Sequence, residues 1–394
     1  MFVTAATILF LAISQAPVHE AQAIFDPVPM HTHGASIAEL PNGDLIAAWF
    51  YGKGEKSDDT LIIQGSRKKA GAGKWSEPFL MADSQDLPDQ NPVLFVDPRG
   101  TLWLFFITSQ DNTYNSYLVK YLTSKNPDGD AAPVWDWQDI MHVRPTNLDT
   151  RLLEDFENYP QQYADYLATH PKYPTWIEDA KAAVTDKLNQ RMGWMTRIHP
   201  IMTSGNRIML PLYSDRFACS LAAFTEDWGK TWTFSEPVLN INVQACFVPR
   251  KDGSIVAYMR DRGAARRVPQ AVSNDAGLTW SHTEMTDLPN PDSSVDCIVL
   301  KSGNWVMVCN DTEGGARGGR NQLAALLSDD EGQTWKWKRH LEKHGEECAA
   351  SYPSVIQAKD GSIHCVYTYS PSPNEAIKHV RFDEAWIKTG ETDQ

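Results

Sequence analysis

The sequence predicts an all-β fold, a six-bladed β-propeller with a helical insertion in the second blade. The first observation behind this prediction is a repeated octapeptide of the form Ser/Thr-x-Asp-x-Gly-x-Thr-Trp, found at 225–232, 273–280 and 328–335. The copies begin 48 and 55 residues apart, a period typical of one supersecondary unit per repeat. In each copy the Asp can hydrogen-bond nearby backbone, the Gly supplies a positive φ, and the Trp buries its ring where the next strand begins.

The second observation is a pair of apolar strands joined by a turn that ends in glycine, which occurs six times. The turn glycines are Gly43, Gly100, Gly205, Gly253, Gly303 and Gly361. One interval, between Gly100 and Gly205, is about twice the others, so it holds either a further blade or an insertion. Because 148–192 has helical spacing, many Glu, Asp and Ala, and no strand pairs, we predict a helical insertion and six blades, with seven as the alternative.

Composition agrees with a single turn-rich domain over 24–394. The chain has 14 Trp and 24 each of Gly and Pro, which suits many short strands with a large aromatic at the turns. A propeller grows by repetition, so its size does not demand a division into smaller domains. The formal net charge of −14 argues against nucleic acid or an anionic membrane as a partner.

The N-terminus predicts a signal peptide over residues 1–23 and a secreted or periplasmic protein. Residues 2–13 are apolar, and Ala21-Gln-Ala23 has the small-x-small form of a cleavage site. The apolar stretch is too short to span a bilayer, so no membrane anchor is expected. The alternative interpretation of this segment is a buried first strand.

Six cysteines would permit disulfides outside the cytoplasm, but four of them fall within predicted strands, where Cys is usually a small buried hydrophobe. Their spacing matches no metal site, and we expect neither a metal nor another cofactor. The sequence predicts no particular oligomeric state.

Strand direction in a propeller predicts which residues share a pocket. The innermost strands all run the same way along the axis, so their first residues meet at one end, and the antiparallel second strands return there. The residues at inner-strand starts are His33, Asn91, Arg197, His199, Gln244, Asp296 and Tyr352. The residues at second-strand ends are Trp49, Tyr213, Asp215, Arg216, Arg260, Asp261, Arg262, Asn310 and Asp311. Such a gathering of polar and aromatic groups favours a ligand site, the alternative being a solvated mouth of the channel.

The octapeptide is the Asp-box motif, and the chain resembles the sialidase-like (BNR-repeat) β-propellers over almost its whole length outside the insertion. The sialidases of this family hold a sugar carboxylate with three arginines, use a Tyr nucleophile activated by a Glu, and use an Asp as acid/base. The resemblance implies that Tyr352 in Ser351-Tyr-Pro-Ser354 is the nucleophile and Arg260 the second arginine. It places the third arginine at Arg320 or Arg317.

The same resemblance puts the acid/base at Asp58 or Asp59, with Asp59 otherwise a substrate contact together with Asn91. Two positions depart from the family pattern: His33 stands where the first arginine is expected, and Gln244 stands where the Glu is expected.

An imidazole lacks the bidentate fork of a guanidinium, and an amide cannot accept a proton from a Tyr. Arg197 is the candidate for the missing cation, and His33 or His199 for the missing base. The Asp-box aspartates are expected to be structural.

Three functions are compatible with these residues. The first is a sialidase-like exo-glycoside hydrolase that releases an acidic or deoxy sugar from a glycan. The second is a lyase or rhamnosidase-like propeller acting on a uronate-containing polysaccharide, in which His, Tyr and Arg carry the chemistry. The third is a non-catalytic glycan-binding propeller, with Trp49 and Tyr51 stacking on sugar faces. A lyase would leave an unsaturated uronate that absorbs ultraviolet light, whereas a hydrolase would not.

Overall fold

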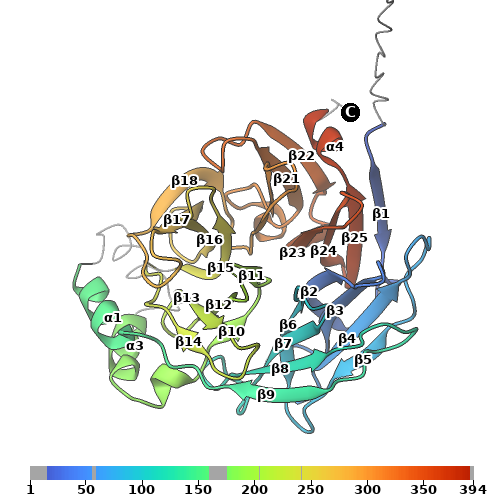
Figure 1. Cartoon of the computed structure of the whole chain (residues 1–394). Helices are drawn as coiled ribbons and strands as arrows, with labels where there is room; N and C mark the ends of the chain where they lie inside the picture. The colour runs from blue at the N-terminus through green and yellow to red at the C-terminus, as the bar shows by residue number, and fades with distance from the viewer. Residues whose placement is uncertain (1–15, 56–58, 159–174, 204, 241, 391–394) are drawn as a thin grey trace, which may run out of the picture.

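The protein is a ring of six β-sheets arranged around a central axis (Figure 1). The computed structural model describes residues 16–55, 59–158, 175–203, 205–240 and 242–390. All neighbouring strands within a blade pair antiparallel, and the first strand of each blade lies nearest the axis. The prediction of an all-β propeller with six blades is confirmed.

The first two blades follow one another along the chain. Blade one contains β2 (His31–Glu39), β3 (Leu45–Gly52), β4 (Ile62–Lys68) and β5 (Phe79–Ala82). Blade two contains β6 (Asp89–Val96), β7 (Leu102–Thr108), β8 (Leu118–Ser124) and β9 (Trp137–Met141). Their second strands, β3 and β7, are buried along almost their whole length, which is why these segments read as nearly continuous apolar runs.

The third blade has an interrupted inner strand. Blade three contains β10 (Met195–Thr196), β11 (Ile201–Met202), β12 (Ile208–Ser214), β13 (Cys219–Thr225) and β14 (Thr233–Phe234). Both β10 and β11 pair with β12, so together they stand in the place of one inner strand. Arg197 and His199 lie in the gap between them.

The last three blades complete the ring. Blade four contains β15 (Asn242–Pro249), β16 (Ile255–Asp261), β17 (Arg267–Ser273) and β18 (Glu284–Pro289). Blade five contains β19 (Asp296–Val299), β20 (Trp305–Cys309), β21 (Gln322–Ser328) and β22 (Trp337–Lys343). Blade six contains β23 (Cys348–Gln357), β24 (Ile363–Pro371), β25 (Ala376–Phe382) and, from the other end of the chain, β1 (His19–Ala23).

The pairing of β1 with β25 closes the ring, with His19 opposite Phe382 and Ala23 opposite Lys378 (Figure 1). The expected cleavage motif Ala21-Gln-Ala23 therefore lies inside the outer strand of blade six. A cut after Ala23 would remove this strand from blade six. Because β1 is mostly exposed, it is an edge strand and not the buried first strand of the alternative interpretation. Residues 1–15 lie outside the described residues.

The helical insertion follows the last strand of blade two and precedes blade three. It contains α1 (Leu148–Glu157), α3 (Trp176–Val184) and the short 3-10 helix η1 (Asn189–Arg191). Leu148, Leu152 and Phe156 recur every four residues and are buried, as expected for an amphipathic helix that rests on the blades. The long interval between Gly100 and Gly205 thus contains the helices and not a seventh blade.

Two further short helices lie elsewhere on the ring. The helix α4 (Glu384–Lys388) follows β25, and Asp383 caps it by accepting a hydrogen bond from the backbone N–H of Trp386 at 2.7 Å. The 3-10 helix η2 (Ala316–Gly319) lies in the glycine-rich loop between β20 and β21.

The three octapeptides form the turns between the third and fourth strands of blades three, four and five. In the second of them the Asp275 carboxylate accepts from Thr279 N at 2.9 Å and from Thr279 Oγ1 at 2.6 Å. Gly277, at φ +86°, donates its N–H to Ser273 Oγ at 2.8 Å. The other two copies repeat these bonds, as a turn closed by its own side chains would.

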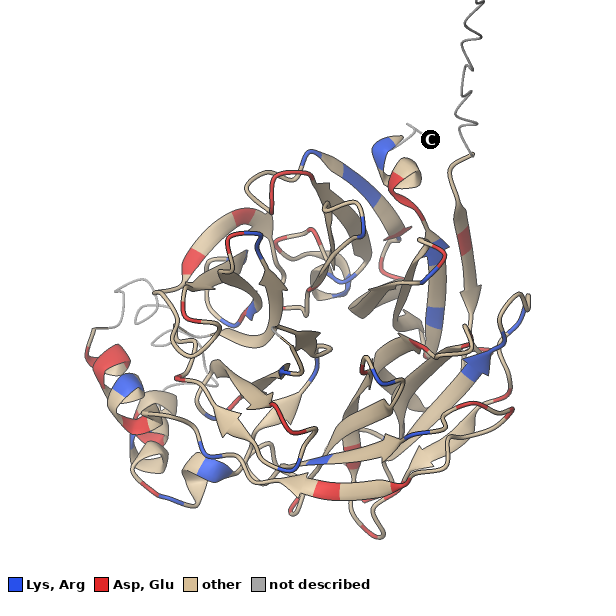
Figure 2. Cartoon of the chain, viewed as in Figure 1, with Lys and Arg blue, Asp and Glu red and all other residues tan. Residues whose placement is uncertain are grey.

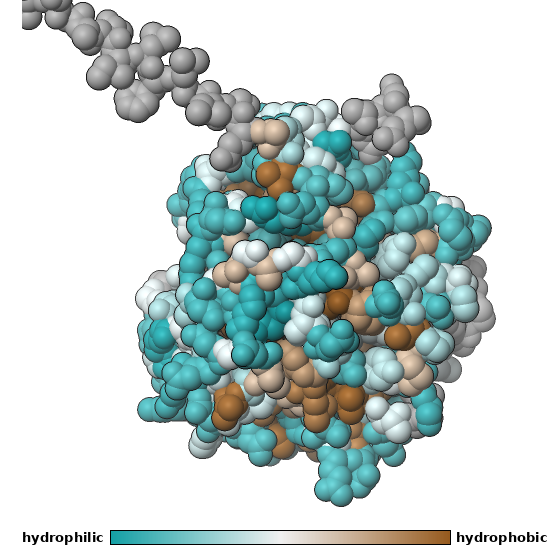
Figure 3. Space-filling model, turned by 90° about the vertical axis from the view of Figure 1, so that its right-hand side faces the viewer, coloured by the Kyte–Doolittle hydropathy of each residue, from teal (hydrophilic) through white to brown (hydrophobic). Residues whose placement is uncertain are grey.

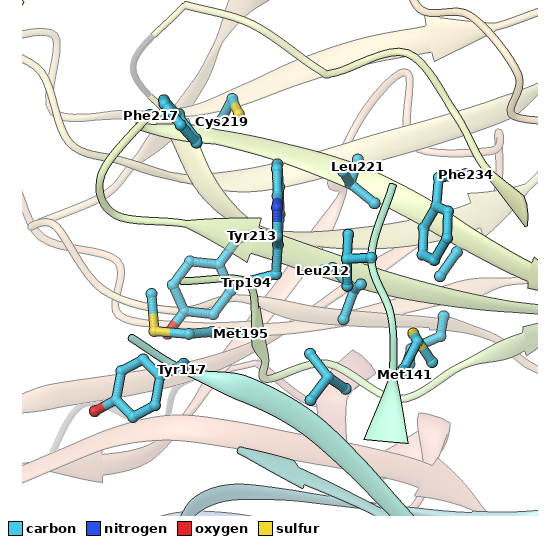
Figure 4. Close-up of a cluster of buried hydrophobic side chains, with 14 of the residues drawn as sticks. Tyr117, Met141, Trp194, Met195, Leu212, Tyr213, Phe217, Cys219, Leu221 and Phe234 are labelled. Atoms are coloured by element: carbon cyan, nitrogen blue, oxygen red, sulfur yellow. The ribbon is translucent and has the colours of Figure 1, made fainter. Parts of the chain in front are cut away.

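The core consists of apolar clusters between and within blades. Trp49, Trp103, Trp194 and Trp305 are among the largest fully buried side chains, and Figure 4 shows one cluster that joins blades two and three. All six cysteines are buried and unpaired, in agreement with their prediction as small hydrophobes within strands.

The surface is mostly hydrophilic. Figure 3 shows scattered hydrophobic residues on one side of the ring, and Figure 2 shows acidic and basic residues interspersed along the outer strands and loops. Within the part of the chain that the structure describes, no helix is both long and apolar enough to cross a membrane.

Candidate active site

A cavity of about 1050 Å³ opens at the end of the axis where the inner strands begin. Inner-strand residues line it together with the ends of second strands, as the strand-direction argument predicts. The predicted residues that line it are His33, Asn91, Tyr213, Asp215, Gln244, Arg260, Arg262, Arg317, Arg320 and Tyr352. The chain therefore brings together groups from all parts of the ring in a concave site of the size typical for small ligands.

A β-bulge in four of the inner strands presents these side chains to the cavity. The pairing register shifts near His33, Asn91, Gln244 and Tyr352. Asn91, Gln244 and Tyr352 have φ of +50°, +60° and +58°, and Gly34 takes the equivalent place in blade one at +66°. A positive φ is costly for residues other than Gly, and such strain is kept where the surrounding structure enforces it, commonly at functional sites.

Guanidinium groups surround Tyr352. Arg260 donates from Nη1 to the Tyr352 Oη at 2.6 Å and from Nε to Asp292 Oδ1 at 2.6 Å. The Arg320 guanidinium lies 5.2 Å from the centre of the Tyr352 ring and donates to the Asp292 carbonyl at 2.8 Å. Although burial works in the other direction, Arg260 and Arg320 lower the pKa of Tyr352 below its ordinary value. A phenol with a depressed pKa beside two cations is a suitable nucleophile or acid.

His33 lies against the same tyrosine. The two ring centres are 4.2 Å apart, and His33 Nδ1 is 2.9 Å from Thr368 Oγ1. Burial holds the pKa of His33 well below 6.5, so its imidazole is neutral at physiological pH. His33 thus supplies no charge at the position where the resemblance predicts an arginine.

A cluster of three residues that no sequence pattern predicted lies beside His33, with the His31 ring stacked on the His33 ring at 5.5 Å between centres. His31 Nδ1 is 3.0 Å from Glu375 Oε2, and His31 Nε2 is 3.6 Å from Glu55 Oε1. Glu55 also accepts a hydrogen bond from Tyr114 Oη at 2.9 Å. Although burial opposes its charge, the hydrogen bond to Glu375 and the nearby Glu55 carboxylate raise the pKa of His31 to about 9. Burial likewise opposes the charge of Glu55, yet the ion pair with His31 lowers its pKa to about 2.

The expected acid/base aspartates are not part of the described cavity wall. Asp59 is exposed and accepts from Asn112 Nδ2 at 2.8 Å, and Asp58 lies outside the described residues. Glu55, four positions before Asp59 in the same loop, lines the cavity instead. The sequence signal for Glu55 was its position directly after Gly54 in the loop that follows β3. A single acidic residue in a loop has no periodicity, so the sequence does not predict whether its side chain points into the cavity.

Arg197 and His199 lie beneath the cavity and do not line it, which corrects their prediction as substrate contacts. Arg197 donates to the carbonyls of Ala35 at 3.1 Å and Pro353 at 2.9 Å, and so joins blades three, one and six. His199 Nδ1 is 3.3 Å from the buried carboxylate of Asp296. Both side chains hold the inner strands together beneath Tyr352. The centre of the Tyr352 ring is 5.1 Å from the Arg197 guanidinium.

Gln244 and Asn91 make a neutral corner of the cavity. Gln244 Nε2 donates to Tyr213 Oη at 3.3 Å, and Asn91 Nδ2 donates to the same oxygen at 3.2 Å. The Gln244 carbonyl oxygen is buried and has no hydrogen-bond partner. Gln244 therefore offers hydrogen bonds but no base at the position where the resemblance predicts a Glu.

The remaining charges on the cavity wall come mainly in pairs. Arg262 Nη1 is 2.6 Å from Asp215 Oδ1. Arg317 and Arg320 flank the glycine-rich loop, with Arg317 at φ +53° in η2. Across the described ranges, no group of three or more His, Cys, Asp or Glu residues is arranged to hold a metal ion.

Comparison with known proteins gives one family and many similar folds. The model of the BNR repeat-like domain family matches residues 43–149 and 170–365. A sialidase of Micromonospora viridifaciens is 24% identical over 174 residues, which is 43% of this chain and 26% of the sialidase. The match thus spans about a quarter of that relative.

Solved structures agree with the fold. A protein of unknown function from Dyadobacter fermentans superposes with a TM-score of 0.67 at 16% identity and covers 92% of this chain and 98% of that one. The intramolecular trans-sialidase of Ruminococcus gnavus gives 0.64 at 14% identity, with 91% and 95% covered. The NanB sialidase of Streptococcus pneumoniae gives 0.65 at 12% identity, with 91% and 69% covered. At such identities the likeness shows the fold alone.

Proposed function

The chain belongs to the BNR repeat-like domain family, and from this membership we propose that it is an exo-acting glycoside hydrolase that releases an acidic sugar from a glycan. The observation that carries the proposal is Tyr352 with Arg260 and Arg320 around it in a cavity of sugar size. Guanidinium groups are the residues of choice for a carboxylate. A tyrosine nucleophile suits an anionic substrate, because a carboxylate nucleophile would be repelled.

In the proposed reaction the Tyr352 oxygen attacks the anomeric carbon while the glycosidic bond breaks. Tyr352 releases its proton to solvent before it attacks, and Arg260, at 2.6 Å from its oxygen, stabilises the resulting phenolate. The departing oxygen takes a proton and leaves as an alcohol. Water then attacks the same carbon as the carbon–oxygen bond to Tyr352 breaks, so that Tyr352 leaves as the phenolate and the sugar is released.

We propose that the His31–Glu55 pair carries the proton, in place of Asp58 or Asp59. His31 is held protonated between two carboxylates and can donate to the departing oxygen. The neutral imidazole, backed by the Glu55 carboxylate, can then take a proton from the attacking water. Glu375 keeps His31 in position, since it accepts from both His31 Nδ1 and Thr32 N.

A second candidate is a lyase, because Gln244 cannot serve as a base and the neutral His33 ring packs against Tyr352. In that reaction His33 would take the proton beside the carboxylate of a uronate. The electron pair would form a carbon–carbon double bond as the bond to the leaving oxygen breaks, and Tyr352 would give that oxygen its proton. Both candidates use the same cavity but leave different products.

Product analysis on acidic glycans tests and separates these reactions. A hydrolase yields new reducing ends, incorporates 18-O from labelled water into the released sugar, and produces no ultraviolet absorbance. A lyase yields an absorbing unsaturated uronate and incorporates no label. Binding without either product would favour a non-catalytic glycan-binding propeller and overturn the hydrolase proposal.

We also propose that the protein is exported, on the basis of its apolar N-terminal residues 2–13. Cleavage is then expected before His19, so that β1 stays in blade six. N-terminal sequencing of the mature protein from the medium or periplasm tests this. A mature protein that begins after Ala23, or one retained in the cytoplasm, would contradict it.

A further inference from the structure

Tyr213 and Gln244 form a neutral corner of the cavity that the proposed reaction leaves unused. Tyr213 is the penultimate residue of β12 and Gln244 lies at the bulge of β15, and both are at least nine-tenths buried. Both residues line the same cavity as Tyr352, so this corner belongs to the same site as the nucleophile. Figure 4 shows the Tyr117 and Tyr213 rings with Met195 at one edge of the apolar cluster, and all three residues line the cavity.

The hydroxyl of Tyr213 is available as a donor. A phenol has two acceptor lone pairs and one hydrogen. The amide N–H groups of Asn91 and Gln244 occupy both lone pairs, at 3.2 and 3.3 Å. Burial raises the pKa of Tyr213 well above 10, so the proton stays on the oxygen. With both lone pairs engaged, this hydrogen is left to reach a group in the cavity.

The carbonyl oxygen of Gln244 is the matching acceptor. Its amide nitrogen is committed to Tyr213, and its oxygen is buried with no hydrogen-bond partner. An unpaired buried oxygen is unfavourable, and a ligand that donates to it removes the penalty. A donor and an acceptor on adjoining side chains are together complementary to a hydroxyl group, which accepts from the one and donates to the other.

We propose that Tyr213 and Gln244 bind a hydroxyl on the sugar carbon next to the reacting carbon, so that the preferred substrate is a hexuronic acid and not an acidic sugar that is deoxygenated at that carbon. This inference rests on the proposed function, which supplies the acidic sugar and the position of the reacting carbon at Tyr352. N-acetylneuraminate lacks the hydroxyl at that carbon, and it would leave the Gln244 oxygen unpaired.

Tyr117 provides a matched control. It is a second buried tyrosine on the cavity wall, but its hydroxyl already donates to Gln90 Oε1 at 2.7 Å. Tyr117→Phe therefore removes a hydroxyl that donates to another side chain of the protein, whereas Tyr213→Phe removes one that is proposed to donate to the ligand.

The experiment measures the affinity of the full chain for free glucuronate, galacturonate, a 2-deoxyhexuronate and N-acetylneuraminate by titration calorimetry, with melting temperatures to confirm folding. We expect a hexuronate to bind most tightly. Tyr213→Phe should weaken that binding by roughly 5- to 30-fold while changing the affinity for the two deoxygenated sugars by less than about twofold. Tyr117→Phe should leave all four affinities nearly unchanged. Gln244→Met, which removes the acceptor at similar length, should reproduce the effect if Tyr213→Phe does not fold.

Tighter binding of N-acetylneuraminate, or an equal loss for all sugars in Tyr213→Phe, would overturn the inference. Turnover of the corresponding aryl glycosides separates it from the proposed function. Selective hexuronate binding without turnover would support the role of Tyr213 and Gln244 and contradict the proposed hydrolase activity. Turnover of a neuraminide in preference to hexuronides would support the proposed hydrolase activity and contradict the role of Tyr213 and Gln244.

Discussion

The octapeptide turns at the outside of the ring and the bulges at its axis share one backbone conformation but have different roles. Both place residues at positive φ: Gly277 at +86° and Ala276 at +59° in one turn, and Gln244 and Tyr352 near +60° in the bulges. The turns satisfy their polar groups internally, since Ser273, Asp275 and Thr279 bond one another and their own backbone. The bulges leave polar groups facing a cavity, as the unpaired Gln244 oxygen illustrates.

This difference explains why the turns share a sequence motif and the bulges do not. A turn that closes on itself needs the same residues every time, so three copies share one pattern. A bulge needs only the backbone shift, and its side chain is free to vary: Gly34, Asn91, Gln244 and Tyr352 occupy equivalent places. Substitutions in the two regions should therefore affect different properties, stability in the turns and turnover in the bulges.

Tyr352→Phe should show the largest effect. It removes the proposed nucleophile, so turnover should fall by at least about 1,000-fold, while the melting temperature stays near that of the parent protein. The measurement is the initial rate on an acidic glycoside, with Tyr117→Phe as the control for loss of a buried hydroxyl. A near-normal rate would remove Tyr352 from the chemistry.

Arg260→Lys comes next. A lysine keeps the charge but cannot bond both Asp292 and Tyr352 through one planar group, so binding of an anionic substrate should weaken by roughly 1–3 kcal/mol. Steady-state kinetics should show this as an increase in KM with some loss of kcat. An unchanged KM would mean that Arg260 is structural.

Glu375→Gln tests the proton-carrying pair through pH. In the parent protein Glu375 and Glu55 raise the pKa of His31 from 6.5 to about 9, so activity that needs protonated His31 should be lost as the pH rises through about 9. His31 likewise adds stability that is complete below pH 6.5 and lost as the pH rises toward 9.

In the Glu375→Gln variant the alkaline limb of kcat should move to lower pH, because one carboxylate partner is gone while Glu55 and the neutral His33 remain. The check is a full pH profile of kcat beside unfolding at several pH values. An unmoved alkaline limb would show that His31 does not carry the proton.

Asp275→Ala addresses the turns. It removes bonds to Thr279 N and Thr279 Oγ1, and should lower the free energy of unfolding by about 1 kcal/mol. Turnover per folded molecule should not change, because the turn lies between β17 and β18, away from the cavity. Denaturant titration and kinetics on the same preparation decide this, and a loss of kcat would break the separation between turns and bulges.

Asp59→Asn should show the smallest effect. Its side chain is exposed and bonded to Asn112, outside the cavity. We expect kcat and KM within about twofold of the parent, the usual range for a surface substitution. A large loss of kcat would restore Asp59 as the acid/base and displace the His31–Glu55 pair.

The sequence by itself determined the ring. Hairpins and Asp-box turns depend on residues only a few positions apart, so their spacing predicted six blades, and strand direction predicted that His33, Gln244, Arg260 and Tyr352 would meet. The family resemblance added roles for these residues, which remain proposals.

Only the tertiary structure decided which neighbours those groups have. His31 and Glu375 lie 344 positions apart, and no local pattern marks them as partners of each other or marks His31 as a partner of Glu55. Arg197 and His199 were predicted to reach the ligand, but the interrupted inner strand of blade three directs them into the channel beneath it. Hydrogen bonds and ion pairs form between groups that are a few ångströms apart in space. The number of residues between two positions predicts such a distance only within a single hairpin.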